Sequence, residues 1–132
     1  MWPFVGRKRC KVWLWLAVER ASRRMVAWVL GARSQATARR WWAALPAHCR
    51  GPRSWYLTDL WESYVGVLPR WQHRRSPKGS GGTSIVEAIN WALRQRCAVL
   101  VRKSCSFSKS LAMHTARIKI VIDNYNANII LN

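Results

Sequence analysis

Acidic residues are the scarcest charged residues in this chain. Five Asp and Glu stand against 23 Lys and Arg among 132 residues, which gives a formal net charge of +18 at pH 7. A charge of this size raises the affinity for any polyanion through counterion release and makes that binding depend strongly on salt. It does not by itself distinguish DNA, RNA and an anionic membrane surface.

Several other sequence signals are absent. The apolar run from Val12 to Val18 is far too short to span a bilayer, and the first residues lack the apolar core of a secretory signal. There is no Gly-x-Ser-x-Gly string and no Walker loop, which disfavours a serine hydrolase and a P-loop nucleotide site. Four cysteines form no Cys-x-x-Cys pair, so we expect reduced, mostly buried thiols, a cytoplasmic location and no structural zinc site. They are Cys10, Cys49, Cys97 and Cys105.

Apolar residues are plentiful. They make up 50% of the sequence and include ten Trp. A chain of this length and composition can bury the core of one compact domain, which excludes a disordered basic tail. Small ribosome-type RNA-binding proteins usually carry few large aromatic residues, so that class is disfavoured. With no internal repeat and no boundary signal, we expect a single domain over residues 1–132.

The hydrophobic pattern predicts an α/β chain. Apolar runs at 11–18 and 25–30, joined by polar residues, predict an antiparallel hairpin. Because the runs barely alternate, we expect both faces to be covered, as in the middle of a mixed sheet with flanking helices. Ser34 is expected to cap a helix that runs to Leu45. A short strand is expected over 55–59, beside the hairpin in the same mixed sheet. Further helices are expected over 61–68, 84–101 and 110–125.

Asp59 and Glu87 are the acids best placed for catalysis. Asp59 ends a predicted strand, at the edge where open α/β sheets commonly bind ligands, but capping the next helix would also explain it. Glu87 closes the string Ser84-Ile85-Val86-Glu87, which also reads as a capping box in which Glu87 bonds the Ser84 amide. Two-ion chemistry on a phosphodiester needs hard oxygen ligands from several elements, and two acids are fewer than it requires. The residues alone leave both interpretations open.

A basic segment separates these two acids. Residues 70–83 are rich in Arg, Lys, Pro, Gly and Ser, which predicts a loop that contacts phosphates or, equally, a solvated linker. Further cations follow on the next predicted helix and beyond it. The candidate DNA-binding residues are Arg70, Arg74, Arg75, Lys78, Arg94, Arg96, Arg102 and Lys103.

Several strings occur in a specific order along the chain. They are Trp-Pro-Phe-Val-Gly at 2–6, Val-Trp-Leu-Trp-Leu-Ala at 12–17, Thr-Asp-Leu-Trp-Glu-Ser-Tyr at 58–64, Val-Glu at 86–87 with Asn90, and Arg-Lys-Ser-Cys-Ser-Phe-Ser-Lys-Ser at 102–110. In this order they resemble the IS-one-type insertion-sequence transposases, specifically their InsB-like catalytic part. The resemblance covers nearly the whole chain.

The resemblance implies a DDE active site on an RNase H-like fold, a mixed sheet with flanking helices. Asp59 would be the second acid, in the Thr-Asp-x-Trp motif, and Glu87 the third, so the catalytic interpretation of both is favoured. The implied activity is DNA strand cleavage and transfer in transposition by two-metal phosphoryl transfer. Magnesium or manganese is the implied cofactor, DNA the implied partner, and a homo-oligomer or the full-length transposase a further partner, with no membrane involved.

The chain departs from the family pattern in three ways. The family's first acid lies in an Asp-Glu-x-Trp string whose Trp corresponds to Trp2, so this Asp and part of the first strand are missing before Met1. Ala88-Ile89 replaces the residues that usually follow the Glu, and the zinc-binding, helix-turn-helix amino-terminal part is absent. We therefore expect a truncated DDE catalytic domain, with a catalytically inactive DNA-binding remnant or regulator as the alternative. A general RNA-binding protein, supported by charge alone, is a third reading.

Overall fold

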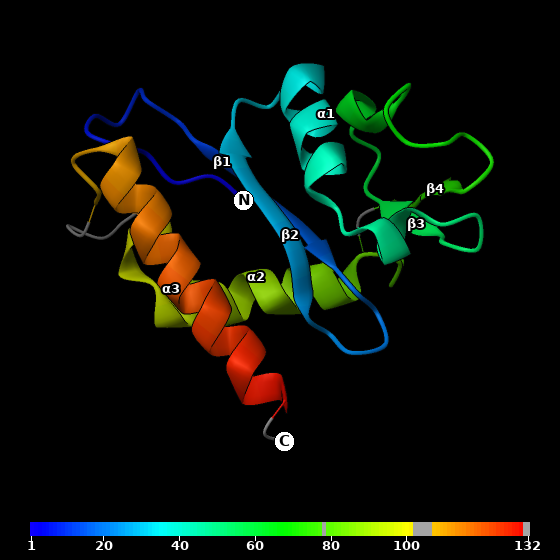
Figure 1. Ribbon diagram of the computed structural model, residues 1–132. Helices are drawn as coiled ribbons and strands as arrows, with labels where there is room; N and C mark the ends of the chain where they lie inside the picture. Colours follow the sequence, from blue (N-terminus) through cyan, green and yellow to red (C-terminus); the bar gives the residue numbers. More distant parts are fainter. Residues whose placement is uncertain (78, 102–106, 131–132) are drawn as a thin grey trace.

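The computed structural model describes residues 1–77, 79–101 and 107–130. Within these ranges the chain is mixed α/β, as predicted (Figure 1). The strands are β1 (Trp13–Val18), β2 (Met25–Gly31), β3 (Tyr56–Thr58) and β4 (His73–Arg75). The α-helices are α1 (Gln35–Ala44), α2 (Ser84–Arg96) and α3 (Leu111–Ile130), and short 3-10 turns are η1 (Ala47–Arg50), η2 (Glu62–Tyr64) and η3 (Ala98–Leu100).

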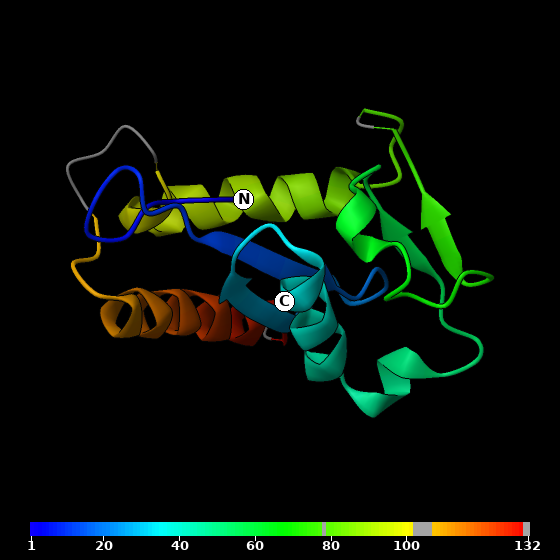
Figure 2. The same ribbon diagram turned by 90° about the horizontal axis from the view of Figure 1, so that it is seen from above.

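β1 and β2 form the predicted antiparallel hairpin and are covered on both faces. α1 packs on one face, and α2 and α3 pack on the other (Figures 1 and 2). Leu14 and Met25 point towards α2 and α3, whereas Trp15 and Ala27 point towards α1. Because every strand position meets a covered face, the two strands need apolar residues throughout rather than at alternate positions.

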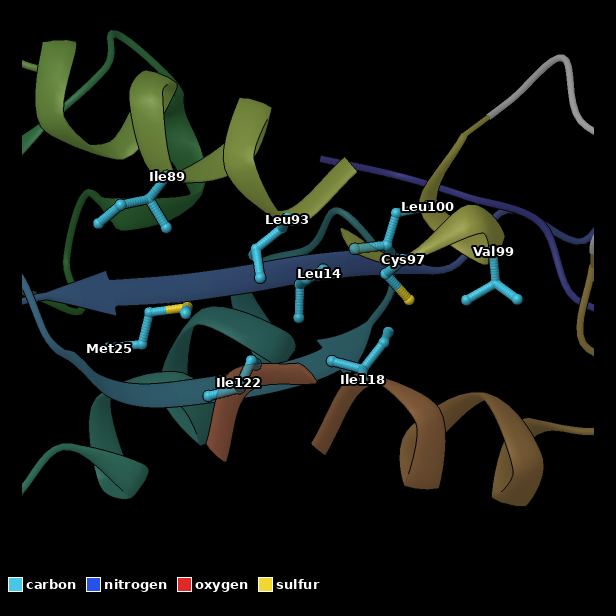
Figure 3. Close-up of a cluster of buried hydrophobic side chains, with 9 residues drawn as sticks. All are labelled: Leu14, Met25, Ile89, Leu93, Cys97, Val99, Leu100, Ile118 and Ile122. Atoms are coloured by element: carbon cyan, nitrogen blue, oxygen red, sulfur yellow. The ribbon is translucent and has the colours of Figure 1, made fainter. Parts of the chain in front are cut away.

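Two hydrophobic clusters hold these layers together. The cluster beside α2 and α3 is drawn in Figure 3 and contains Leu14, Met25, Ile89, Leu93, Cys97, Val99, Leu100, Ile118 and Ile122. The cluster beneath α1 contains Trp15, Ala17, Ala27, Ala38, Trp41, Leu45 and Leu68. The first cluster fixes α2, the helix that carries Glu87, against the hairpin.

Residues 1–5 run antiparallel beside the first half of β1. The backbone N–H of Val12 donates to the Pro3 carbonyl at 3.0 Å, and that of Leu14 donates to the Met1 carbonyl at 2.8 Å. At the other end, the Val5 N–H donates to the Cys10 carbonyl at 3.0 Å. This short ladder extends the hairpin sheet by one irregular strand.

The prediction that Asp59 ends a strand of the same sheet is wrong. Among the described strands, β3 pairs in parallel with β4 and not with the hairpin, with Thr58 opposite Arg75. The free edge of residues 1–5 is partly occupied instead by Ser108, which bridges Val5 and accepts the Gly6 N–H at 2.8 Å. The three residues of β3 pair instead with His73, Arg74 and Arg75 of β4. An RNase H-like sheet is therefore not confirmed.

Three predicted boundaries also change. The loop predicted over 70–83 contains β4. The helix predicted over 61–68 is only the turn η2, which ends where Val65 turns extended, ahead of Gly66 with its left-handed φ of 77°. The helix predicted over 84–101 ends at Arg96, where Cys97 turns extended, and resumes as η3. In the part of the chain that the structure describes, no helix has the length and apolar character needed to cross a membrane.

Candidate metal and nucleic-acid site

Asp59 is exposed and directly follows β3. Its Oδ1 accepts a hydrogen bond from the Trp61 backbone N–H at 3.2 Å, which holds the chain in a turn ahead of η2. Its Oδ2 has no hydrogen-bond partner among the described residues. The capping interpretation therefore accounts for one carboxylate oxygen and leaves the other available.

Glu87 lies in the first turn of α2, but the predicted capping box is wrong. Thr83 is the N-cap and Ser84 the first helical residue, so Glu87 is one position too far along to reach back to its cap amide. The Thr83 hydroxyl instead donates to the Glu87 carboxylate at 3.2 Å, and the Ser84 hydroxyl donates to the Gly81 carbonyl at 2.9 Å. An exposed carboxylate at this end of a helix is favoured by the helix dipole.

The start of α2 lies against the ends of β3 and β4. The Ser76 N–H donates to the Thr58 carbonyl at 2.9 Å, directly before Asp59. A Cβ atom added to Gly82 would lie 2.7 Å from the Ser76 Cβ and 3.9 Å from a Leu57 methyl group. This close approach requires glycine and brings the loop before Glu87 to the strand that precedes Asp59. A separation of roughly 5 to 8 Å between the two carboxylates, the span of two bridging ions, stays a prediction.

No cation neutralises either acid within the described ranges. The one ion pair there joins Lys119 Nζ to Asp123 Oδ2, 2.6 Å apart on α3. Burial raises the pKa of the Tyr64 hydroxyl, and the Asp59 charge raises it further while Arg33 lowers it. Asp59 and Arg33 therefore both influence the pKa of Tyr64. The Asp59 carboxylate itself forms no ion pair among the described residues.

A surface of stacked aromatic and cationic side chains adjoins Asp59. The Arg33 guanidinium lies 3.3 Å from the ring centre of Trp61 and 4.6 Å from that of Trp13. The Trp13 ring is 6.2 Å from Trp2, and Lys11 Nζ lies 4.7 Å from the Trp2 ring. We call these five residues the aromatic ladder. The sequence did not reveal it, because its members come from four segments whose contact depends on the fold.

The predicted DNA-binding cations fall into separate groups. Arg70 is exposed, and Arg74 and Arg75 lie in β4, where the Arg74 guanidinium is 4.4 Å from the Trp55 ring and Arg75 donates to the Leu60 carbonyl. Arg94 and Arg96 lie near the far end of α2, about 10 to 14 Å along the helix from Glu87. Lys78, Arg102 and Lys103 lie outside the described residues. The structure thus brings the cations of β4, but not those of α2, to the strand that precedes Asp59.

Sequence comparison settles the family. The sequence model of the IS1 transposases matches residues 1–127, a range that includes Asp59 and Glu87. This chain belongs to the IS1 transposase family. The resemblance expected from the ordered strings is confirmed.

Similar proteins are insertion-element proteins of enteric bacteria. The chain is 38% identical over 113 residues to the insertion element IS1 protein InsB of Shigella flexneri, covering 86% of this chain and 82% of that protein. It is 32% identical over 124 residues to the iso-IS1n protein InsB of Shigella dysenteriae, covering 94% and 90%. It is 36% identical over 113 residues to the IS1 4 protein InsB of Escherichia coli (strain K12), of which the match covers 64%. No solved structure matches this chain.

Proposed function

We propose that this chain is a DDE-type transposase catalytic domain, which in its complete form, with a third carboxylate, cleaves and joins DNA strands of an insertion element by two-metal phosphoryl transfer. The observation that carries the proposal is a pair of exposed carboxylates free of ion pairs within the described residues, inside the stretch that matches the IS1 transposases. Asp59 follows β3 and Glu87 opens α2, and the Gly82 to Ser76 contact links those elements. The order of hairpin, helix, strand and helix supports an RNase H-like single domain as part of this proposal.

The donor atoms suit a hard divalent cation such as magnesium or manganese. Carboxylate oxygens are the ligands that such ions prefer, and those of Asp59 and Glu87 are hydrogen-bonded only to neutral donors among the described residues. Asn90, one turn after Glu87, adds a buried side-chain oxygen with no hydrogen-bond partner in the described part of the chain. When bound, such ions activate the attacking oxygen and stabilise the leaving oxygen. A pair of ions needs more oxygen ligands than two carboxylates supply.

The surrounding cations would hold the DNA. Arg74 and Arg75 lie in β4, which pairs with β3, and Arg70 shortly precedes that strand. These three cations would contact phosphates without reading the sequence. The aromatic ladder beside Asp59 adds the cations Arg33 and Lys11, which would contact further phosphates. In this arrangement the strand end and the helix start hold the carboxylates, and the cations position the phosphodiester next to them.

A third carboxylate can be added at a position that the ladder of residues 1–5 defines. The Met1 carbonyl accepts the Leu14 N–H and the Pro3 carbonyl accepts the Val12 N–H, so residues 1–3 run antiparallel to the segment they pair with. A residue two positions before Met1 would therefore lie opposite Leu16 in β1. An Asp-Glu pair placed directly before Met1 puts its Asp there, on the strand next to the hairpin.

Nicking of supercoiled plasmid DNA with magnesium or manganese tests the proposal. The chain extended by Asp-Glu is expected to nick the plasmid, and Asp59→Asn or Glu87→Gln in the extended chain is expected to abolish nicking. Glu62→Gln, which removes an exposed acid of η2, is the matched control and should keep the activity. A folded extended chain without nicking would contradict the catalytic proposal.

The second candidate is a catalytically inactive DNA-binding regulator, which the shortage of carboxylates favours. It would bind DNA, or form oligomers with itself or with full-length transposase, without cutting. Nicking by the unextended chain that Asp59→Ala abolishes would rule this candidate out.

A further inference from the structure

Three potential metal ligands that the proposed active site does not use meet at the end of the hairpin. Glu19 directly follows β1, and His48 and Cys49 lie in η1. A carboxylate oxygen, an imidazole nitrogen and the thiol sulfur of these residues all lie within 4.8 Å of one another. It is the one such trio found among residues 1–77, 79–101 and 107–130.

We propose that Glu19, His48 and Cys49 form a zinc site that ties the β1–β2 turn to η1. In a tetrahedral zinc site the ligand atoms are roughly 3.4 to 3.6 Å apart, so atoms already within 4.8 Å need to move by about 1 Å. A thiolate and an imidazole select zinc over magnesium, which prefers oxygen ligands alone. Three protein ligands leave the fourth position to water.

The ligands are held by contacts that do not involve a metal. The Tyr56 hydroxyl donates to the Cys49 carbonyl at 2.8 Å, and the Cys49 N–H donates to the Pro46 carbonyl at 3.0 Å, so η1 is fixed against β3. The Ser22 hydroxyl donates to the Glu19 carboxylate, and the Glu19 N–H donates to the Arg24 carbonyl at 2.9 Å. A hydroxyl that bonds a ligating carboxylate orients it, as outer partners of metal ligands commonly do.

The charges of the cluster also favour a bound cation. Among the described residues no Lys or Arg forms an ion pair with Glu19, although the chain carries a net charge of +18. Binding exchanges the Cys49 S–H bond for an S–Zn bond and releases the thiol proton to solvent. The two positive charges of zinc then offset the carboxylate and the thiolate.

Zinc at this position would hold the connection that leads from α1 through η1 into β3. It would thus restrain the strand that precedes Asp59 through Tyr56, whose hydroxyl donates to the Cys49 carbonyl. This zinc site does not depend on the proposed catalysis, because its ligands are different residues and its preferred metal is different.

Cobalt and zinc titration of the metal-free chain tests the proposal. Cobalt is expected to bind at one equivalent with the charge-transfer absorption of a cobalt–thiolate bond, and zinc should displace it. Cys49→Ser and His48→Ala should each weaken binding about 100-fold, since losing a ligand costs at least as much as losing an outer partner. Glu19→Gln should weaken binding by about tenfold or more. Cys10→Ser, which removes an exposed free thiol, is the matched control and should change nothing.

Several outcomes would overturn the zinc site. In the unaltered chain, absence of the cobalt–thiolate absorption would refute the zinc site without any variant. Unchanged affinity in folded Cys49→Ser or His48→Ala, or displacement of cobalt by a thousandfold excess of magnesium, would refute it as well. Asp59→Asn should leave the thiolate absorption unchanged, and its loss in the folded variant would contradict a zinc site that is independent of the acid pair.

Discussion

Asn126 joins the carboxy-terminal helix to the start of β2 by two hydrogen bonds. Its Oδ1 accepts the Met25 N–H at 2.9 Å and its Nδ2 donates to the Met25 carbonyl at 2.9 Å, as a neighbouring strand would. Met25 is 4% exposed, so water cannot freely replace the lost partner. Each bond contributes about 0.5 to 1.5 kcal/mol, and a buried group left without a partner costs about 1 to 3 kcal/mol. Asn126→Ala should therefore lower the free energy of unfolding by about 2 to 4 kcal/mol.

Urea denaturation of three variants measures this effect. Asn124→Ala is the matched control: it lies two residues away on α3, is exposed, and gains the same helix propensity as the test variant. It should change the free energy of unfolding by no more than about 0.5 kcal/mol. Asn126→Asp keeps the acceptor but loses the donor, so its loss should be intermediate if the variant keeps the same m-value. A difference below about 0.5 kcal/mol between Asn126→Ala and Asn124→Ala would refute the reasoning.

Two further predictions concern salt and pH. Changing four cations to Ser should flatten the dependence of log DNA affinity on log salt by about one unit per lost phosphate contact, measured by fluorescence anisotropy. An equal loss of charge at the hairpin turn and in the loop before β3 should flatten it less. The test set is Arg70, Arg74, Arg75 and Lys78, and the control set is Arg20, Arg23, Arg24 and Arg53. Equal salt slopes for the two variants would show that 70–83 is only a linker. Acidification should lower the free energy of unfolding because the pKa of His114 is lowered, mainly by burial and further by the charge of Arg117. The His114 Nδ1 shares a hydrogen bond with the Ser108 hydroxyl. The stability it contributes is present above its ordinary pKa of about 6.5 and falls below it, so urea midpoints at pH of about 7.5 and 5.5 that coincide would contradict this assignment.

The sequence predicts those elements whose burial leaves a local pattern. The hairpin was predictable because strands covered on both faces are apolar at nearly every position. The start of α1 was predictable because the Ser34 side chain accepts the Thr37 N–H, as an N-cap residue should. The placement of Asp59 after a strand and Glu87 at a helix start also followed from local strings.

Pairing between distant segments was not predictable. β3 has three residues, too few for a hydrophobic pattern to specify its partner, and the chain offers both β4 and the hairpin. Thr83 and Ser84 are both good cap residues, so the string could not decide which one begins α2. Sequence spacing did not predict the trio of Glu19, His48 and Cys49, because Glu19 comes from a different element than the other two.

The most direct test of the proposed active site is paramagnetic broadening by manganese in the NMR spectrum of the unaltered chain. If Asp59 and Glu87 share one ion, their backbone signals should broaden together at the same manganese concentration, and the signals of His48 and Cys49 should broaden less. Either Asp59→Asn or Glu87→Gln should then protect both signals. Broadening near one acid without the other, or a variant that protects only its own signal, would contradict a shared metal site.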